Sequence, residues 1–111
     1  MPSSEQSLIV IMTTLPDMEQ ASNIAKILVE EGLAVCVQVM PRMTSIYRWQ
    51  GEVCIEPEHL VLIKAIATQY DALANRLKSL HPYEIPEIIA MPAIAVDLDY
   101  LNWAMLSTSL K

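Results

Sequence analysis

Glycine, cysteine and basic residues are all scarce in this sequence, and each shortage excludes a class of function. The 111 residues include only two glycines, and no glycine-rich phosphate loop, G-x-S-x-G or H-E-x-x-H motif occurs. The two cysteines, Cys36 and Cys54, form no C-x-x-C pair, so the sequence indicates neither a disulfide framework nor a zinc site. Because no catalytic motif is present, we predict that the protein is not an enzyme.

The sequence also lacks a cluster of positive charge and a long apolar run. Lys and Arg total 7 against 13 Asp and Glu, a net charge of −6, which makes nucleic acid a poor partner. Hydrophobic residues make up 53%, yet the longest apolar runs, such as residues 8–12, are far shorter than the about 18 residues of a membrane-spanning helix. Residues 1–7 carry no Lys or Arg, so we expect a cytoplasmic protein without a membrane partner.

The first third of the chain predicts a strand followed by a helix. Residues 8–14 are aliphatic and β-branched, as in a strand that is covered on both faces. Asp17 and Gln20 fit an N-cap and capping-box pair at the start of a helix. Apolar residues then recur at helical spacing over residues 21–28, and Gly32 ends the helix.

The middle of the chain predicts a long β-hairpin whose turn is Gln50-Gly51. Apolar segments flank this dipeptide on both sides, over residues 33–49 and 52–68. Pro41 and Pro57 cannot donate ladder hydrogen bonds, so each predicts a bulge or an edge position.

The two-residue turn also predicts the register of the hairpin. It places Cys54 opposite Tyr47 and Cys36 opposite Ala65. The two sulfur atoms are then about 35 Å apart. This register excludes a disulfide or a shared metal ion between the two cysteines of one chain.

The last third of the chain predicts a helix, a strand and a final helix. Thr68 is the expected cap of the first of these helices, which ends at His81-Pro82. Residues 86–96 predict a strand that is either at an edge of the sheet or bulged, because Pro92 interrupts them. Asp97 is the expected cap of the last helix.

This order of elements predicts an α+β fold, a ferredoxin-like βαββαβ sandwich with an extra C-terminal helix. Right-handed crossovers place both main helices on one face of the sheet. The strand over residues 60–67 is apolar on both faces, so the face without helices would expose a large apolar patch. We therefore expect self-association as a closed ring, and this argument leaves a dimer and a trimer equally open.

Three polar or soft residues are candidates for a binding role. Lys64 sits among apolar neighbours, so we expect either an anionic partner or an amine that reaches water past an aliphatic stem. Cys36 is either a small buried hydrophobe or a soft metal ligand and reactive thiol. His81 either hydrogen-bonds carbonyls at the end of a helix or serves as a metal ligand.

Short motifs in a fixed order make the chain resemble the CutA family of divalent-cation tolerance proteins from residue 8 onwards. These motifs lie at residues 34–37 (AVCV), 45–51 (SIYRWQG), 58–64, 81–83 (HPY), 86–87 (PE) and 99–103 (DYLNW). The resemblance implies a single CutA-like domain over residues 1–111, with residues 1–7 flexible, assembled as a homotrimer. It also implies a non-enzymatic role in cation tolerance. The bound ion would be Cu²⁺ or another divalent cation, and no firmly bound cofactor is expected.

The same resemblance supplies the expected site residues. Metal binding would involve Cys36 and His81. The family is similar in architecture to the trimeric PII signalling proteins, which bind small effectors between subunits. By that similarity a cleft between subunits would be lined by Cys36, Trp49, Glu58, Lys64, Tyr83 and Glu87. An alternative function is therefore a PII-like sensor of a small anionic metabolite.

Overall fold

A computed structural model describes residues 7–109 of the chain. The predicted flexible segment, residues 1–7, lies outside the described residues except for Ser7. The elements in chain order are β1 (Leu8–Leu15), α1 (Met18–Glu30), β2 (Cys36–Trp49), β3 (Glu52–Ile66), the 3₁₀ turn η2 (Ala67–Gln69), α2 (Tyr70–Leu80), β4 (Ile89–Pro92) and α3 (Leu98–Ser109).

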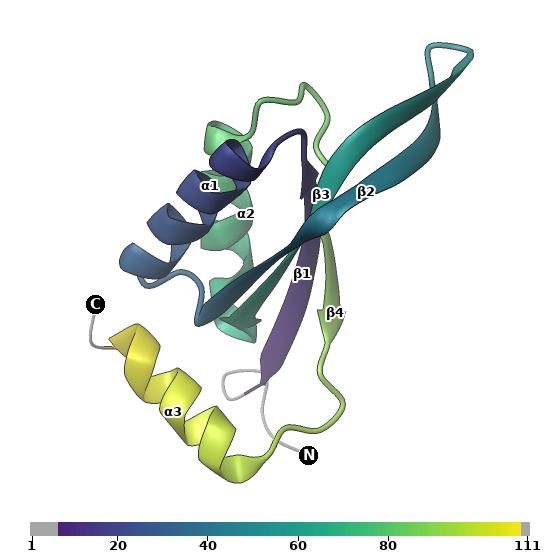
Figure 1. The fold of residues 1–111 in the computed structure, drawn as a ribbon. Helices are drawn as coiled ribbons and strands as arrows, with labels where there is room; N and C mark the ends of the chain where they lie inside the picture. The colour runs from purple at the N-terminus through teal and green to yellow at the C-terminus, as the bar shows by residue number, and fades with distance from the viewer. Residues whose placement is uncertain (1–6, 110–111) are drawn as a thin grey trace.

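The four strands form one antiparallel sheet in the order β2-β3-β1-β4. Figure 1 shows α1 and α2 side by side on one face of this sheet. The mixed α+β fold, the order of its elements and the additional C-terminal helix are as predicted. None of the helices in the described part of the chain is long and apolar enough to cross a bilayer.

The main core lies between the two helices and the sheet. Its buried members come from alternate positions of β1 and β3 and from the inner stripes of α1 and α2, as strand and helix periodicities require. They are Ile9, Ile11, Leu15, Ala21, Ile24, Leu28, Ala34, Val61, Ile63, Ala65, Leu73 and Leu77. Each large side chain among them stabilises the fold by about 1.5–3 kcal/mol.

The first helix begins and ends as the sequence predicts. The Asp17 carboxylate accepts hydrogen bonds from the backbone and the side-chain nitrogens of Gln20, at 2.8 and 2.6 Å. These bonds lower the pKa of Asp17 below its ordinary value. At the other end Gly32 has φ +74°, and the Leu33 amide donates to the Leu28 carbonyl, which closes a Schellman motif.

Two predicted boundaries are wrong. Thr68 does not cap α2, because it lies inside the 3₁₀ turn and Gln69 occupies the N-cap position without a side-chain hydrogen bond. The fourth strand covers only Ile89–Pro92 rather than residues 86–96, since β1 pairs with it over residues 9–12 alone. Its predicted position at the edge of the sheet is confirmed.

The hairpin turn is confirmed, and the register beyond it changes once. Gln50 and Gly51 both have positive φ, at +50° and +83°, as a type I′ turn requires. Tyr47 lies opposite Cys54 as predicted, but Cys36 lies opposite Lys64 and not Ala65.

A bulge between Val39 and Arg42 causes this correction, because it adds one residue to β2 and shifts every later pair by one. Pro41 lies within it, as predicted. His59 Nδ1 donates to the Met40 carbonyl across the bulge at 2.9 Å, and His59 is only 8% exposed. His59 therefore holds the bulge in place.

The outer part of the hairpin projects beyond the rest of the sheet. The pairing of β1 with β3 ends at Leu15 opposite His59, so residues 42–58 form a two-stranded arm, which extends from the sheet in Figure 1. Pro57 lies just beyond this limit, where one edge of β3 has no neighbouring strand and a missing N–H is tolerated.

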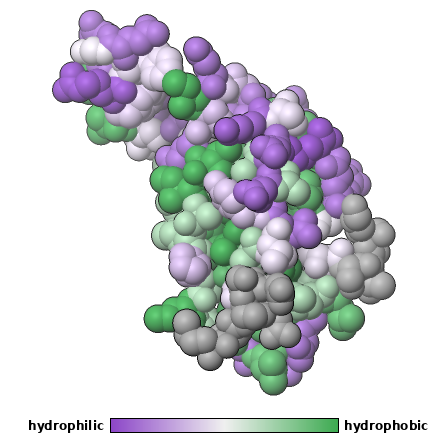
Figure 2. All heavy atoms as spheres, turned by 180° about the vertical axis from the view of Figure 1, so that it is seen from behind, coloured by the Kyte–Doolittle hydropathy of each residue, from purple (hydrophilic) through white to green (hydrophobic). Residues whose placement is uncertain are grey.

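The sheet face away from α1 and α2 is covered only at one end. There α3 buries Ala104 against Leu8, Val35 and Ile66, and the Asp97 side chain caps the helix by accepting from the Tyr100 amide, as predicted. The remaining apolar side chains on this face are partly or fully exposed and include Val10, Met12, Leu60, Leu62, Ile89 and Met91. Figure 2 shows hydrophobic atoms gathered over the middle of this face.

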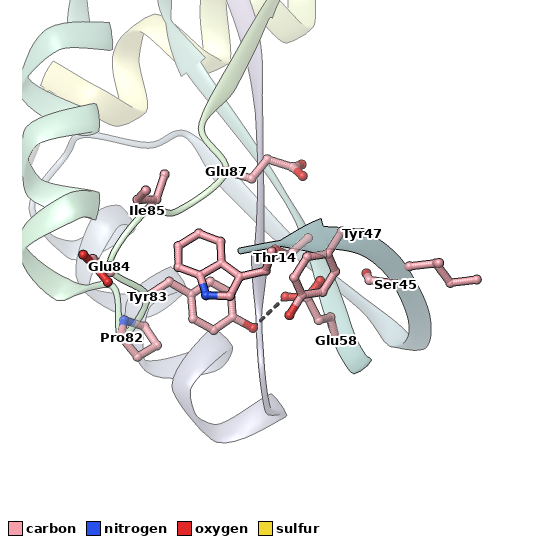
Figure 3. A pocket seen from close by; sticks show the side chains of 11 residues that line it. Thr14, Ser45, Tyr47, Glu58, Pro82, Tyr83, Glu84, Ile85 and Glu87 are labelled. Atoms are coloured by element: carbon pink, nitrogen blue, oxygen red, sulfur yellow. Dashed lines mark hydrogen bonds between the residues drawn. The ribbon is translucent and has the colours of Figure 1, made fainter. Parts of the chain in front are cut away.

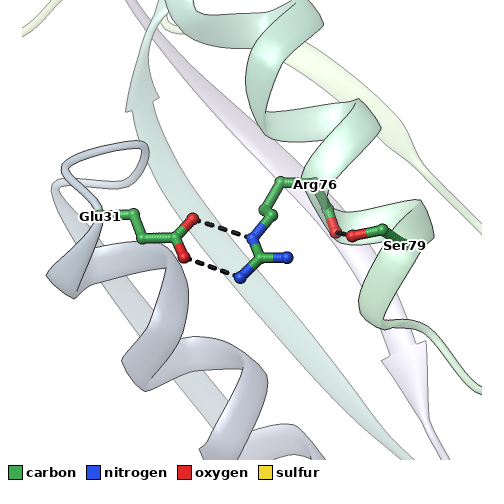
Figure 4. A network of polar contacts seen from close by, with 3 residues as sticks. All are labelled: Glu31, Arg76 and Ser79. Atoms are coloured by element: carbon green, nitrogen blue, oxygen red, sulfur yellow. Dashed lines mark hydrogen bonds and ion pairs between the residues drawn. The ribbon is translucent and has the colours of Figure 1, made fainter.

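A bidentate ion pair joins the two helices at the surface. Arg76 donates from Nε and from a terminal nitrogen to the Glu31 carboxylate at 2.9 and 2.7 Å, and the Ser79 hydroxyl donates to the Arg76 carbonyl (Figure 4). The hydrogen bonds to Glu31 raise the pKa of Arg76. Both side chains are about 40% exposed, so water screens the pair and it contributes little to the stability of the fold.

Replacement of His59 tests the role of the bulge. His59→Ala leaves the Met40 carbonyl without its donor and should lower the free energy of unfolding by about 1–3 kcal/mol. His59→Asn can present an amide N–H near the Nδ1 position and should recover much of the loss. Urea unfolding at one protein concentration measures both variants, and an alanine variant as stable as the wild type would contradict this role.

Candidate functional site

A cleft of about 620 Å³ lies where the hairpin arm meets the end of β1 and the segment that joins α2 to β4. Tyr47 and Trp49 come from β2, Glu58 comes from β3, and Tyr83 and Glu87 come from the α2–β4 segment. The complete lining is Thr14, Ser45, Ile46, Tyr47, Trp49, Glu58, Pro82, Tyr83, Glu84, Ile85 and Glu87. Three separate parts of the chain therefore build this cleft.

Side chains alternate between the two faces of the hairpin strands, which explains why the cleft residues of the arm project from one face. Trp49, Tyr47, Ser45 and Met43 pair with Glu52, Cys54, Glu56 and Glu58 in turn. Because opposite and alternate residues share one face, the two rings and the Glu58 carboxylate project together. Tyr47 was not among the predicted site residues, although the predicted register already places it on this face.

Glu58 and Tyr83 form the polar centre of the cleft. The Tyr83 hydroxyl donates to Glu58 Oε2 at 2.6 Å, and Glu58 is only 7% exposed. Burial first, and then the hydrogen bond to Glu58, raise the pKa of Tyr83 well above its ordinary value of 10.0. Tyr83 therefore remains a neutral donor. Figure 3 shows the Tyr83–Glu58 bond with Tyr47 beside it.

His81 is buried behind this cleft, and both of its ring nitrogens are engaged. Nε2 lies 2.9 Å from the Thr14 carbonyl and 3.2 Å from the Thr13 hydroxyl, and Nδ1 accepts from the Tyr83 amide at 3.2 Å. Since a carbonyl can only accept, Nε2 carries the proton of a neutral ring. His81 thus binds a carbonyl as one prediction stated, but the carbonyl belongs to β1 rather than to the end of a helix.

Cys36 and Lys64 lie together at the other end of the sheet. Cys36 is partly buried against the cluster beneath α3. Lys64 faces it across the ladder and places its Nζ 5.9 Å from the centre of the Tyr100 ring. Within residues 7–109 no carboxylate forms an ion pair with Lys64, so its expected anionic partner is replaced there by an aromatic ring.

The predicted ligand-binding set is therefore divided in two. Trp49, Glu58, Tyr83 and Glu87 share the cleft, whereas Cys36 and Lys64 do not line it. Glu58 and Lys64 are six residues apart on β3, which corresponds to about 20 Å. The lining contains no Lys or Arg, so the cleft of one chain does not favour the anionic-metabolite alternative.

The two predicted metal ligands do not meet within one chain. His81 bonds the Thr13 side chain, which points to the helix side of the sheet, whereas Cys36 shares the opposite face with Lys64. No group of three or more His, Cys, Asp or Glu in the described part of the chain is arranged to hold a metal ion. Both cysteines are free thiols. A single copy therefore does not fit a divalent cation at these residues.

Titration of His81 tests its buried, neutral state. Burial is the main cause that lowers the pKa of His81 below 6.5, against smaller opposing effects of Thr14 and Glu58. The unfolded chain therefore binds this proton more readily, so stability is complete above about pH 6.5 and should fall as the pH drops below it. His81→Asn should flatten this dependence between pH 7.5 and 5.5 in urea unfolding. A wild-type His81 ring that titrates above 6.5 by NMR would contradict this interpretation.

Comparisons with known proteins agree on one family. Residues 9–107 match the family described as CutA1 divalent ion tolerance protein. The Divalent-cation tolerance protein CutA of Thermus thermophilus is 49% identical over 94 residues, which are 85% of this chain and 91% of the relative.

Solved structures show the same relationship. A divalent cation tolerance protein (Cut A1) from Thermus thermophilus has a TM-score of 0.84 at 48% identity, covering 86% of this chain and 93% of that one. A CutA from Archaeoglobus fulgidus, described as periplasmic, has a TM-score of 0.88 at 28% identity, with coverages of 91% and 98%. The cytoplasmic location expected from the sequence thus stays a prediction.

Proposed function

Because the chain belongs to the CutA1 family of divalent ion tolerance proteins, we propose that it is a non-enzymatic protein of divalent-cation tolerance that acts as a homotrimer. The family description names tolerance of cations and not a reaction. The observation that carries the assembly is the sheet face opposite α1 and α2, whose apolar side chains are left uncovered by α3. Monomers rarely expose such a continuous apolar face.

Packing of sheet against sheet is the simplest way to cover this face. Met12 and Leu62 are paired across β1 and β3 at its centre and are only half-buried in one chain. The edge residues Ile89 and Met91 are 48% and 44% exposed. A closed ring of three copies, in which each copy packs against the next through a heterologous interface, would bury these side chains.

Light scattering coupled to size-exclusion chromatography tests this assembly. The wild type should elute with three times the 12.4 kDa mass of one chain. Leu62→Glu places a charge at the centre of the apolar face and should shift the mass towards one chain. Val29→Glu introduces the same charge on the exposed side of α1 and should leave the trimer intact. A wild-type mass of a single chain at micromolar concentration would contradict the proposal.

We further propose that Cu²⁺ or another divalent cation associates with the assembled protein. A site at Cys36 requires ligands from more than one copy, because the described residues of one chain contain no group of three or more His, Cys, Asp or Glu that could hold a metal ion. The engaged nitrogens of His81 argue against a direct role for its ring. The proposal thus rests on the family for the cation and on Cys36 for the soft ligand.

Zinc is a suitable probe because it cannot oxidise the thiol. In calorimetric titrations Cys36→Ser should weaken the tightest zinc binding by at least about tenfold, whereas Cys54→Ser, the matched control for the second free thiol, should not change it. His81→Asn should also retain binding, because its ring nitrogens are already hydrogen-bonded. Binding that survives in Cys36→Ser would remove the proposed ligand.

A further inference from the structure

The cleft between the hairpin arm and the α2–β4 segment combines aromatic rings with negative charge and lacks any basic side chain. Tyr47, Trp49 and Tyr83 supply the rings, and Glu58 and Glu87 supply carboxylates from different elements. Figure 3 shows Tyr47 and Tyr83 around the Glu58 carboxylate, with Glu87 across the opening and Glu84 turned towards Pro82. Rings and carboxylates together attract a cation rather than an anion.

The burial of Glu58 is a second observation that favours a cation in the cleft. It is only 7% exposed, yet the Tyr83 hydroxyl is its one hydrogen-bond partner among residues 7–109. No Lys, Arg or His nitrogen in that range forms an ion pair with it. Burial of a carboxylate without a counter-charge is costly, so positive charge that enters the cleft would stabilise Glu58.

The acidic groups near Tyr47 act in the same direction. Burial first, and then the charges of Cys54, Glu56 and Glu58, raise the pKa of Tyr47. Arg48 is the nearest basic residue in sequence, but it alternates to the other face of the arm, where it pairs with Val53. The overall charge of −6 adds to the attraction for cations at longer range.

The size and chemistry of the cleft favour an organic cation over a metal ion. A transition metal needs several ligands at about 2.0–2.3 Å, and the described residues hold no such group. An alkylated ammonium group needs only ring faces within about 6 Å and a nearby carboxylate. The volume of about 620 Å³ is in the range typical of small-molecule sites.

We propose that this cleft binds a small organic cation with an alkylated ammonium group, which packs against Tyr47, Trp49 and Tyr83 and faces the Glu58 carboxylate. This site does not include Cys36, and Thr14 and Glu58 place it at the end of the sheet face that carries Leu60 and Leu62. It does not depend on the proposed role in divalent-cation tolerance.

The two tryptophans of the chain allow a direct binding measurement. Trp103 lies on α3 outside the cleft and is 49% exposed, so Trp103→Phe leaves Trp49 as the single tryptophan. Choline chloride, with sodium chloride at matched ionic strength as a blank, should cause a saturable change in Trp49 emission. Its uncharged isostere 3,3-dimethylbutan-1-ol should bind at least about tenfold more weakly, since it lacks the charge.

Variants then assign the interaction to the cleft. Calorimetry with choline should show at least about tenfold weaker binding for Glu58→Gln, which can still accept from Tyr83, and for Trp49→Ala. Glu30→Gln and Trp103→Ala are matched controls on exposed helical positions and should bind like the wild type. Thermal unfolding of each variant verifies that the fold is retained.

Three results would overturn the proposal. The first is equal affinity for choline and its neutral isostere, and the second is unchanged binding in both cleft variants. The third is a Trp49 response to inorganic phosphate or zinc with none to choline at millimolar concentration. The mass of the assembly and the effect of Cys36→Ser on zinc affinity are measured separately, so the two sets of experiments fail independently.

Discussion

The pairing of β2 with β3 decides where every candidate functional side chain lies. From the turn to Arg42 the pairs follow the two-residue hairpin, which places Tyr47, Trp49 and Glu58 on one face of the projecting arm. The bulge at Val39/Arg42 then moves the register by one residue. Since one residue reverses the face of a strand, this single irregularity places Cys36 beside Lys64 under α3, on the face away from α1 and α2. The hydrogen bond from His59 to the Met40 carbonyl is the side-chain contact that supports it.

Most of the fold could be predicted because short sequence patterns mark the ends of its helices and turns, and several patterns indicate the same boundary. Asp17, Gln20 and Gly32 mark both ends of α1, and positive φ at Gln50 and Gly51 follows from the turn that these residues predict. The errors arise where a local signal does not determine the outcome. Pro41 indicates a disturbed ladder but not the number of residues inserted. Residues 93–96 are as apolar as a strand, yet their only backbone hydrogen bond to β1 is from the Ala93 amide to the Leu8 carbonyl, and only the tertiary structure reveals that the ladder stops there.

The site was predicted less completely, for a different physical reason. Four of the six expected ligand-binding residues converge in the cleft, whereas Cys36 and Lys64 are held about 20 Å away by the length of β3. A sequence motif shows only the order of residues in the chain. It does not show which face of a strand, or which copy of the protein in an assembly, carries each residue. Tyr47 could have been included, since the predicted pairing with Cys54 already places it on the face of Trp49 and Glu58.

Charge and ligand chemistry explain why the two proposed cation sites lie at separate places. A thiol at the edge of an apolar interface attracts a soft metal only when further ligands converge on it, so such a site depends on assembly. The cleft needs no convergence of that kind, because ring faces attract positive charge over a broad surface and Glu58 is already buried beside them. Neutral Tyr83 and neutral His81 support Glu58 from behind without supplying a counter-charge. A cation that enters from the open side of the cleft would therefore meet a carboxylate with which no Lys, Arg or His of residues 7–109 forms an ion pair.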